Sequence, residues 1–88
     1  MYFVYILYSS KLNNFYTGLT QNISKRVKQH NNKEVPFTSM GRPWQLVYYE
    51  VFINKSDAIN EEKFLKTGKG RERRRFLLKN FIAKIKGS

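Results

Sequence analysis

The chain has 88 residues, 17 of them Lys or Arg and 6 Asp or Glu, so its formal net charge is +11 with the single His neutral. This length fits one domain, residues 1–88, and a hydrophobic fraction of 41% predicts a packed core rather than a disordered chain. The absence of Cys excludes disulfide frameworks and thiolate metal sites. So strong a basic excess indicates a polyanionic partner, nucleic acid before others.

Membrane association and secretion are not expected. No apolar run approaches the roughly 18–20 residues of a membrane span, and residues 1–10 lack the basic region and cleavage site of a signal peptide. We therefore expect a cytoplasmic protein without a membrane partner. The charge is concentrated in residues 55–88, with eleven basic and four acidic residues. A basic helix at about 71–86 leaves an anionic membrane surface as an alternative partner.

A β-hairpin is expected at the start of the chain. Residues 2–8 are β-branched and aromatic throughout, which is typical of a central strand buried on both faces. Period-2 alternation puts Tyr5 on the face opposite to Val4. A polar turn ending in Asn-Asn leads to a second strand at residues 15–20. Gly18 within this strand indicates a bulge or a close approach to the backbone.

A short basic helix over about residues 22–31 is expected next. Ile23 and Val27 form its apolar side. At 100° per residue, Arg26 and His30 fall on that same side, toward the sheet. Two interpretations stay open: an Arg that snorkels at the rim with a His satisfied by backbone groups, or an Arg and a His presented into a site.

The rest of the chain is expected to form a loop at residues 31–43 and a strand at residues 44–52. Two helices are expected to follow, from 58 to about 67 and from about 71 to 85. Gly68 and Gly70 are expected to end the first of these helices. Phe76 and Phe81 are expected to share the apolar face of the second. The order ββαβαα predicts an α+β fold with a three-stranded, mainly antiparallel sheet flanked by helices.

An acidic residue lies on the apolar side of the helix that begins at Ala58. Glu62 falls between Ala58 and Leu65 around the helix, and Phe64 widens this arc enough to bring Glu61 partly inside it. A buried, unpaired carboxylate is costly. A salt bridge to a basic neighbour or a metal ligand is therefore expected, and the helix geometry alone does not separate the two acids.

These residues occur in an order that resembles the GIY-YIG nuclease family. Phe3-Val4-Tyr5 and Tyr16-Thr17-Gly18 are followed by Arg26 and His30 on a helix, then by Glu62 on another. Small stand-alone members, related to the catalytic domain of the bacterial excision-repair nuclease subunit, are the most similar. Phe3 stands where the family name has Gly and Thr17 where it has Ile, both at strand-packing positions. The resemblance extends from residue 2 to about 78.

The resemblance implies hydrolysis of DNA phosphodiesters with one divalent cation, Mg²⁺ or Mn²⁺. Glu62 would be the metal ligand, and Arg26 would hold the scissile phosphate through its guanidinium fork. Tyr5, favoured over Tyr16, would take the proton of the attacking water, with His30 as its proton acceptor or orienter. A phenol has an ordinary pKa near 10, so nearby positive charge is expected to lower the pKa of this tyrosine.

Lys and Arg side chains are expected to follow the phosphate backbone, which is a sequence-independent contact. The residues assigned to this contact are Lys25, Lys63, Lys66, Lys69, Arg71 and Arg73. We therefore expect a structure-preferring or weakly sequence-specific endonuclease of DNA repair or recombination, acting on double-stranded or branched DNA. The alternative is a non-catalytic nucleic-acid-binding module that keeps the fold.

Overall fold

The computed structural model describes residues 1–87, whose strands form one antiparallel sheet in the order β2-β1-β3. Its strands are β1 (Tyr2–Ser9), β2 (Asn14–Thr20) and β3 (Trp44–Phe52). The central position of the first strand and the hairpin that joins it to the second are as predicted. β2 therefore forms one edge of the sheet, and its outer side is left open.

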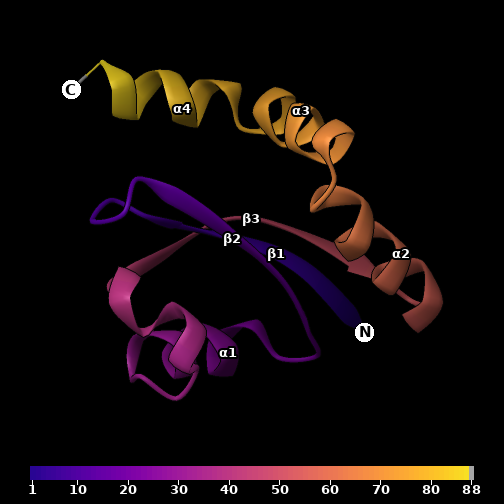
Figure 1. The fold of residues 1–88 in the computed structure, drawn as a ribbon. Helices are drawn as coiled ribbons and strands as arrows, with labels where there is room; N and C mark the ends of the chain where they lie inside the picture. The colour runs from indigo at the N-terminus through magenta and orange to yellow at the C-terminus, as the bar shows by residue number, and fades with distance from the viewer. Residues whose placement is uncertain (88) are drawn as a thin grey trace.

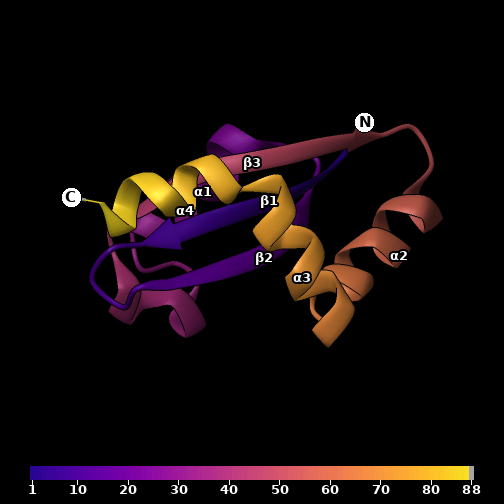
Figure 2. The same ribbon diagram turned by 90° about the horizontal axis from the view of Figure 1, so that it is seen from above.

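Helices cover both faces of the sheet (Figure 1). One side carries α1 (Ile23–Asn31) and the 3₁₀ helix η1 (Pro36–Gly41); the other carries α2 (Lys55–Leu65), α3 (Gly68–Leu77) and α4 (Lys79–Lys86). The view from above shows β2 along the edge of the sheet, with α3 beside it (Figure 2). No helix in residues 1–87 is long and apolar enough to cross a membrane.

Alternation along β1 divides the core into two halves. Val4 packs with Ala58 and Leu65 of α2 on one face, and all three are at most 1% exposed. Tyr5 packs with Trp44 on the other face. Removing an apolar side chain of this size from water stabilises the fold by about 1.5–3 kcal/mol. The predicted separation of Val4 from Tyr5 is thus confirmed, and it aims Tyr5 at α1.

The two glycines after α2 begin a helix instead of ending one. Thr67 caps α3 by accepting a hydrogen bond from the Gly70 backbone amide at 3.1 Å. Gly70 is buried, and a Cβ at this position would collide with the Phe64 carbonyl oxygen. Gly70 therefore permits the close approach of α3 to the end of α2. α2 itself starts earlier than predicted, at Lys55.

The single helix predicted over 71–85 is divided at Leu78. This residue leaves helical geometry, with φ −111° and ψ 18°, and its side chain is only 5% exposed. The break lets Phe81 pack against Tyr8, with ring centroids 5.3 Å apart. Phe76 stays 63% exposed and does not share an apolar face with Phe81. The prediction was wrong because an amphipathic pattern cannot show that the backbone turns inward at one buried Leu.

The segment 31–43 is more ordered than an irregular loop. The turn of η1 within it buries Thr38, whose carbonyl accepts a hydrogen bond from Trp44 Nε1 at 2.7 Å. The Asn31 side chain binds the backbone of Trp44 twice: its Oδ1 accepts from the Trp44 amide at 2.7 Å, and its Nδ2 donates to the Trp44 carbonyl at 3.1 Å. These bonds fix η1 against the end of α1, and so fix Thr38 beside His30.

Candidate active site

Gly18 of β2 lets the Tyr5 side chain reach across the sheet edge. The two residues are partners in the β1–β2 pairing. A Cβ at Gly18 would collide with the Tyr5 hydroxyl and ring, so the phenol occupies the space that a side chain would need. The predicted close approach is confirmed, whereas the irregular register lies between β1 and β3, after Ile6.

α1 brings Arg26 and His30 to the hydroxyl of Tyr5. The His30 Nε2 atom lies 2.9 Å from that oxygen, and Arg26 Nε donates to it at 3.4 Å. His30 is fully buried. The expectation that both residues share the sheet-facing side of the helix is confirmed, and His30 is satisfied by side chains rather than by backbone groups.

Thr38 fixes the tautomer of His30. His30 Nδ1 lies 2.7 Å from Thr38 Oγ1, and Thr38 donates its one hydroxyl proton to the Val35 carbonyl at 3.2 Å. The threonine oxygen therefore accepts from His30, which places the imidazole proton on Nδ1. Nε2 is left as an acceptor, so the hydroxyl of Tyr5 donates to it.

Burial keeps both the His30 imidazole and the Tyr5 phenol neutral. It lowers the pKa of His30 to about 4, with a further lowering from the charge of Arg26. Burial also raises the pKa of Tyr5, and this outweighs the lowering by the Arg26 hydrogen bond. The expectation of a lowered phenol pKa is therefore wrong for the free protein, because desolvation of a phenolate exceeds the effect of one guanidinium at this depth.

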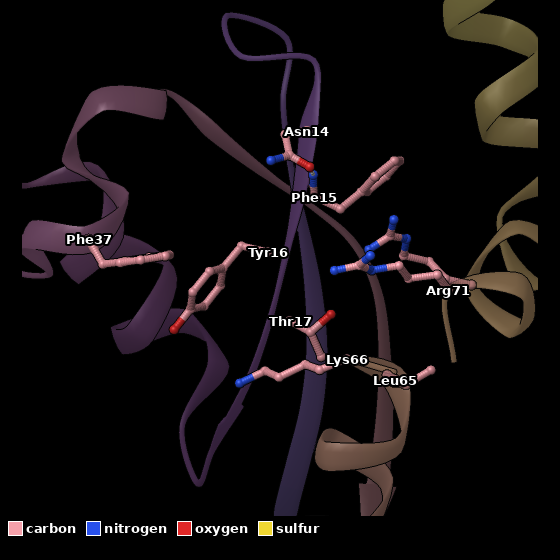
Figure 3. Close-up of a pocket in the computed structure, with 9 residues that line it drawn as sticks. Asn14, Phe15, Tyr16, Thr17, Phe37, Leu65, Lys66 and Arg71 are labelled. Carbon is pink, nitrogen blue, oxygen red and sulfur yellow. Dashed lines mark hydrogen bonds between the residues drawn. The ribbon is translucent and has the colours of Figure 1, made fainter. Parts of the chain in front are cut away.

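A hollow of about 700 Å³ follows the outer edge of β2, beside these residues (Figure 3). Its lining comes from β2, η1, α2 and α3: Asn14, Phe15, Tyr16, Thr17, Phe37, Leu65, Lys66, Arg71 and Arg74. Tyr16 joins the hollow to the hydrogen-bonded group, since its ring centroid is 5.0 Å from that of His30 and 6.4 Å from that of Tyr5. The hollow therefore lies next to the hydrogen-bonded residues Tyr5 and His30, which form the proton chain with Arg26 and Thr38.

The structure separates the two acids of α2. Burial is the main cause of the raised pKa of Tyr5, and the charge of Glu62 makes the smallest contribution. The charge of Glu61 raises the pKa of Glu50 instead. Glu62 is 22% exposed and pairs with Lys66 one turn later, at 3.2 Å. The salt bridge left open by the sequence is thus present, and its lysine also lines the hollow.

Glu62 is the acid of α2 whose charge affects the pKa of Tyr5. Residues 1–87 contain no group of three or more His, Cys, Asp or Glu side chains arranged to hold a metal ion. Mg²⁺ is commonly bound through one or two carboxylates together with several waters and substrate phosphates. Glu62 fits such a site, in which substrate supplies part of the coordination, and does not fit a cage built from protein ligands.

The residues predicted to contact the phosphate backbone are divided by the structure. Lys66 and Arg71 line the hollow, and Lys25 lines a smaller one of about 320 Å³ together with Arg26. The remaining three line neither hollow: Lys63, Lys69 and Arg73.

Sequence reasoning missed three residues near the site. Thr38 and Phe37 lie in the segment expected to be irregular, and nothing in its composition marks either of them. Arg74 had a usable signal, because it lies three residues after Arg71 and so on the same face of a helix.

Comparison with known proteins gives a consistent result. The family model described as GIY-YIG catalytic domain matches residues 1–75. A UPF0213 protein of Clostridium perfringens is 45% identical over 67 residues, which are 75% of this chain and 71% of the relative. One from Limosilactobacillus reuteri is 32% identical over 88 residues, covering 97% and 91% of the two chains.

A solved structure agrees. The solution NMR structure of a UPF0213 protein from Bacillus halodurans has a TM-score of 0.54 and 30% identity, and covers 88% of this chain and 85% of its own. The match of the family model spans β1 to α3 and includes every residue of the hydrogen-bonded chain. The chain therefore belongs to the GIY-YIG family, as one of its small UPF0213-like members.

Proposed function

We propose that this protein is a divalent-metal-dependent endonuclease that hydrolyses DNA phosphodiester bonds with little sequence preference, in repair or recombination. The observation that carries the proposal is the hydrogen-bonded chain from Arg26 through Tyr5 and His30 to Thr38. It lies next to Tyr16, which lines a cationic hollow. A proton acceptor and a phosphate-binding guanidinium thus meet at one hydroxyl, which is what in-line hydrolysis of a phosphate ester requires.

Arg26 is the phosphate-binding residue of the proposal. Its Nε is engaged with Tyr5, and one terminal nitrogen donates to Gln29 Oε1 at 3.1 Å. The side chain is therefore held in place before substrate arrives, and further N–H groups remain for phosphate oxygens. Preorganised positive charge at this position stabilises the negative charge that grows on the phosphoryl oxygens.

Tyr5 and His30 form the proton path. The attacking water passes a proton to the Tyr5 oxygen while the phenolic proton moves to His30 Nε2; hydroxide oxygen bonds to phosphorus and the 3′-oxygen leaves, taking a proton from solvent. A concerted transfer avoids a free phenolate, which burial disfavours. Phosphate beside Arg26 offsets the charge that lowers the pKa of His30, so substrate itself makes the acceptor more basic.

Glu62 would hold the divalent cation, which when bound supplies Lewis acidity at the phosphate and the leaving oxygen. In the free protein Lys66 partly neutralises this carboxylate. Lys66 lines the hollow, so an approaching phosphate offers it another partner and releases Glu62.

Nicking of supercoiled plasmid in Mg²⁺ or Mn²⁺ tests the proposal. We expect Glu62→Gln and Arg26→Gln each to lower the rate by at least ~10²-fold. Glu61→Gln is the matched control, because this neighbouring acid acts on Glu50 and not on Tyr5. Nicking that persists in Glu62→Gln, or tight DNA binding without metal-dependent nicking in the unaltered protein, would contradict the enzyme and favour a binding module.

A further inference from the structure

Arg74 is a guanidinium of α3 with an unusual environment. Within residues 1–87 it forms no ion pair, and its Nε is buried with no hydrogen-bond acceptor. Its guanidinium lies over the Phe15 ring, 4.7 Å from the centroid. Burial lowers its pKa, as do the charges of Arg71 and Arg75. A partly desolvated cation next to two others is costly unless an anion binds it.

The position of Arg74 indicates where this anion would lie. Arg71, one turn earlier on α3, lines the same hollow as Arg74, and Lys66 closes it from the end of α2. Figure 3 shows Arg71 on the α3 side of β2, across the strand from Tyr16 and Phe37. The hollow therefore has three cations in its lining, two from α3 and one from the end of α2.

The opposite wall of the hollow is aromatic. Phe37 of η1 is 86% exposed, although it lines the hollow. Its ring centroid is 6.3 Å from that of Tyr16, with the planes inclined by 50°. A large exposed ring on a helix fixed by other residues offers a flat apolar surface at small entropic cost. Nucleobases stack on such rings with a gain of about 1–3 kcal/mol per base.

We propose that the β2-edge hollow binds a nucleotide whose base is unpaired, with Phe37 stacked on the base and Arg71 and Arg74 on flanking phosphates. Cations on one wall and an exposed ring on the other match the two sides of a single polynucleotide strand, since a base within a duplex is not free to stack on Phe37. This inference rests on the proposed function and names its substrate class: DNA with an unpaired nucleotide at the site, such as a single strand, flap, gap or mismatch.

Binding by the Glu62→Gln protein tests the inference separately from cleavage. Fluorescence anisotropy would compare a single-stranded oligonucleotide with its perfect duplex over a range of salt concentrations. Because stacking contributes about 1–3 kcal/mol, Phe37→Leu should weaken single-strand binding by ~5–150-fold and leave duplex binding unchanged. Phe37→Tyr should keep the affinity, because it keeps the ring. Met40→Ala is the control, since Met40 is 71% exposed on the same 3₁₀ helix and lies outside the hollow.

The arginines are tested through the salt dependence of the same binding. Arg71→Gln and Arg74→Gln should each reduce the slope of log affinity against log salt for the single strand by about 0.7. Arg75→Gln is the control, because Arg75 is exposed on α3 and does not line the hollow. A quenched signal from 2-aminopurine in the oligonucleotide, restored by Phe37→Leu, would support stacking directly.

Two outcomes would overturn the inference: equal weakening of duplex and single-strand binding by Phe37→Leu, or affinity and salt slope unchanged in Phe37→Leu and Arg74→Gln. Neither outcome bears on catalysis, because nicking by the protein with Glu62 intact is measured independently. Conversely, loss of the nuclease proposal would leave a positive stacking result standing.

Discussion

Two clusters of polar side chains lie on opposite faces of the sheet. The site cluster comprises Arg26, Tyr5, His30 and Thr38, and its buried His30 has a partner at each ring nitrogen. The acid cluster comprises Tyr48, Glu50 and Glu61, and Glu50 Oε1 is buried without a hydrogen-bond partner in the described chain. Full satisfaction on one face indicates a preorganised group. On the other face, burial first and then Glu61 raise the pKa of Glu50 to about 7.

The clusters affect stability in opposite directions as pH changes. The pKa of His30 falls from 6.5 to about 4 on folding. Neutral His30 therefore contributes to the free energy of unfolding above pH 6.5, and this contribution is lost as pH falls toward 4. The pKa of Glu50 rises from 4.5 to about 7, mainly through burial and then through Glu61. Its contribution is present below pH 4.5 and is lost as pH rises through 7. The two effects offset each other between these limits.

The largest expected effect comes from breaking the site cluster at its centre. Tyr5→Phe keeps the ring and removes the hydroxyl that takes the proton, so the cleavage rate should fall by ~10²–10⁴-fold. Tyr8→Phe is the matched control: Tyr8 is also buried in β1, but faces the other side and donates to Asn13. If Tyr16→Phe abolished cleavage while Tyr5→Phe did not, Tyr16 would be the base.

The next largest effect is expected at Gly18. Gly18→Ala places a methyl group where the Tyr5 hydroxyl lies and displaces the phenol from His30. A shift of about 1 Å at a reacting group costs ~10²-fold in rate, and overpacking costs about 1–3 kcal/mol of stability. Gly68→Ala is the control, because no atom lies within 4 Å of a Cβ there. A normal rate in Gly18→Ala would show that Tyr5 need not occupy this position.

A smaller effect is expected from Thr38→Val, which leaves His30 Nδ1 without its hydrogen-bond partner. Loss of the acceptor for His30 Nδ1–H should cost about 1–3 kcal/mol of unfolding free energy. The tautomer should also become mixed, with a ~10-fold lower cleavage rate. Thr38→Ser should restore both quantities, and Ser39→Ala, which removes a bond to Pro36 on the same 3₁₀ helix, should change neither. Denaturant unfolding and single-turnover cleavage measure these effects.

The smallest expected effect concerns the acid cluster. Glu50→Gln removes the ionisation that opposes folding. The free energy of unfolding should therefore be unchanged at pH 4.5 and higher by about 1 kcal/mol at pH 7.5. The effect is small because Glu50 keeps contact with solvent, which screens its charge. Its cleavage rate should equal that of the unaltered protein. Glu72→Gln, on the exposed surface of α3, is the control. Lower stability of Glu50→Gln at pH 7.5 would contradict the assignment.

Regular periodicity made part of this molecule predictable. The 100° step placed Arg26 and His30 together, and alternation placed Tyr5 opposite to Val4, because both depend only on local geometry. The assignment of Glu62 to this site came from the family resemblance and stays a prediction, since helix geometry could not distinguish it from Glu61.

The remaining features depend on tertiary contacts. Thr38 reaches His30 only because Trp44 and Asn31 fix η1, and the break at Leu78 follows from its burial. The raised pKa of Tyr5 likewise reflects its depth in the folded protein rather than its neighbours along the chain.

The imidazole of His30 offers the most direct test, since it is the protein's single His and its NMR signals need no assignment. Nitrogen-15 shifts should show a proton on Nδ1 at pH 7 and titration near pH 4, with a higher pKa when Arg26→Gln removes the neighbouring charge. A proton on Nε2 would contradict the account, because His30 could then not accept the proton of Tyr5. A pKa near 6.5 in the unaltered protein would contradict the burial of the imidazole beside Arg26.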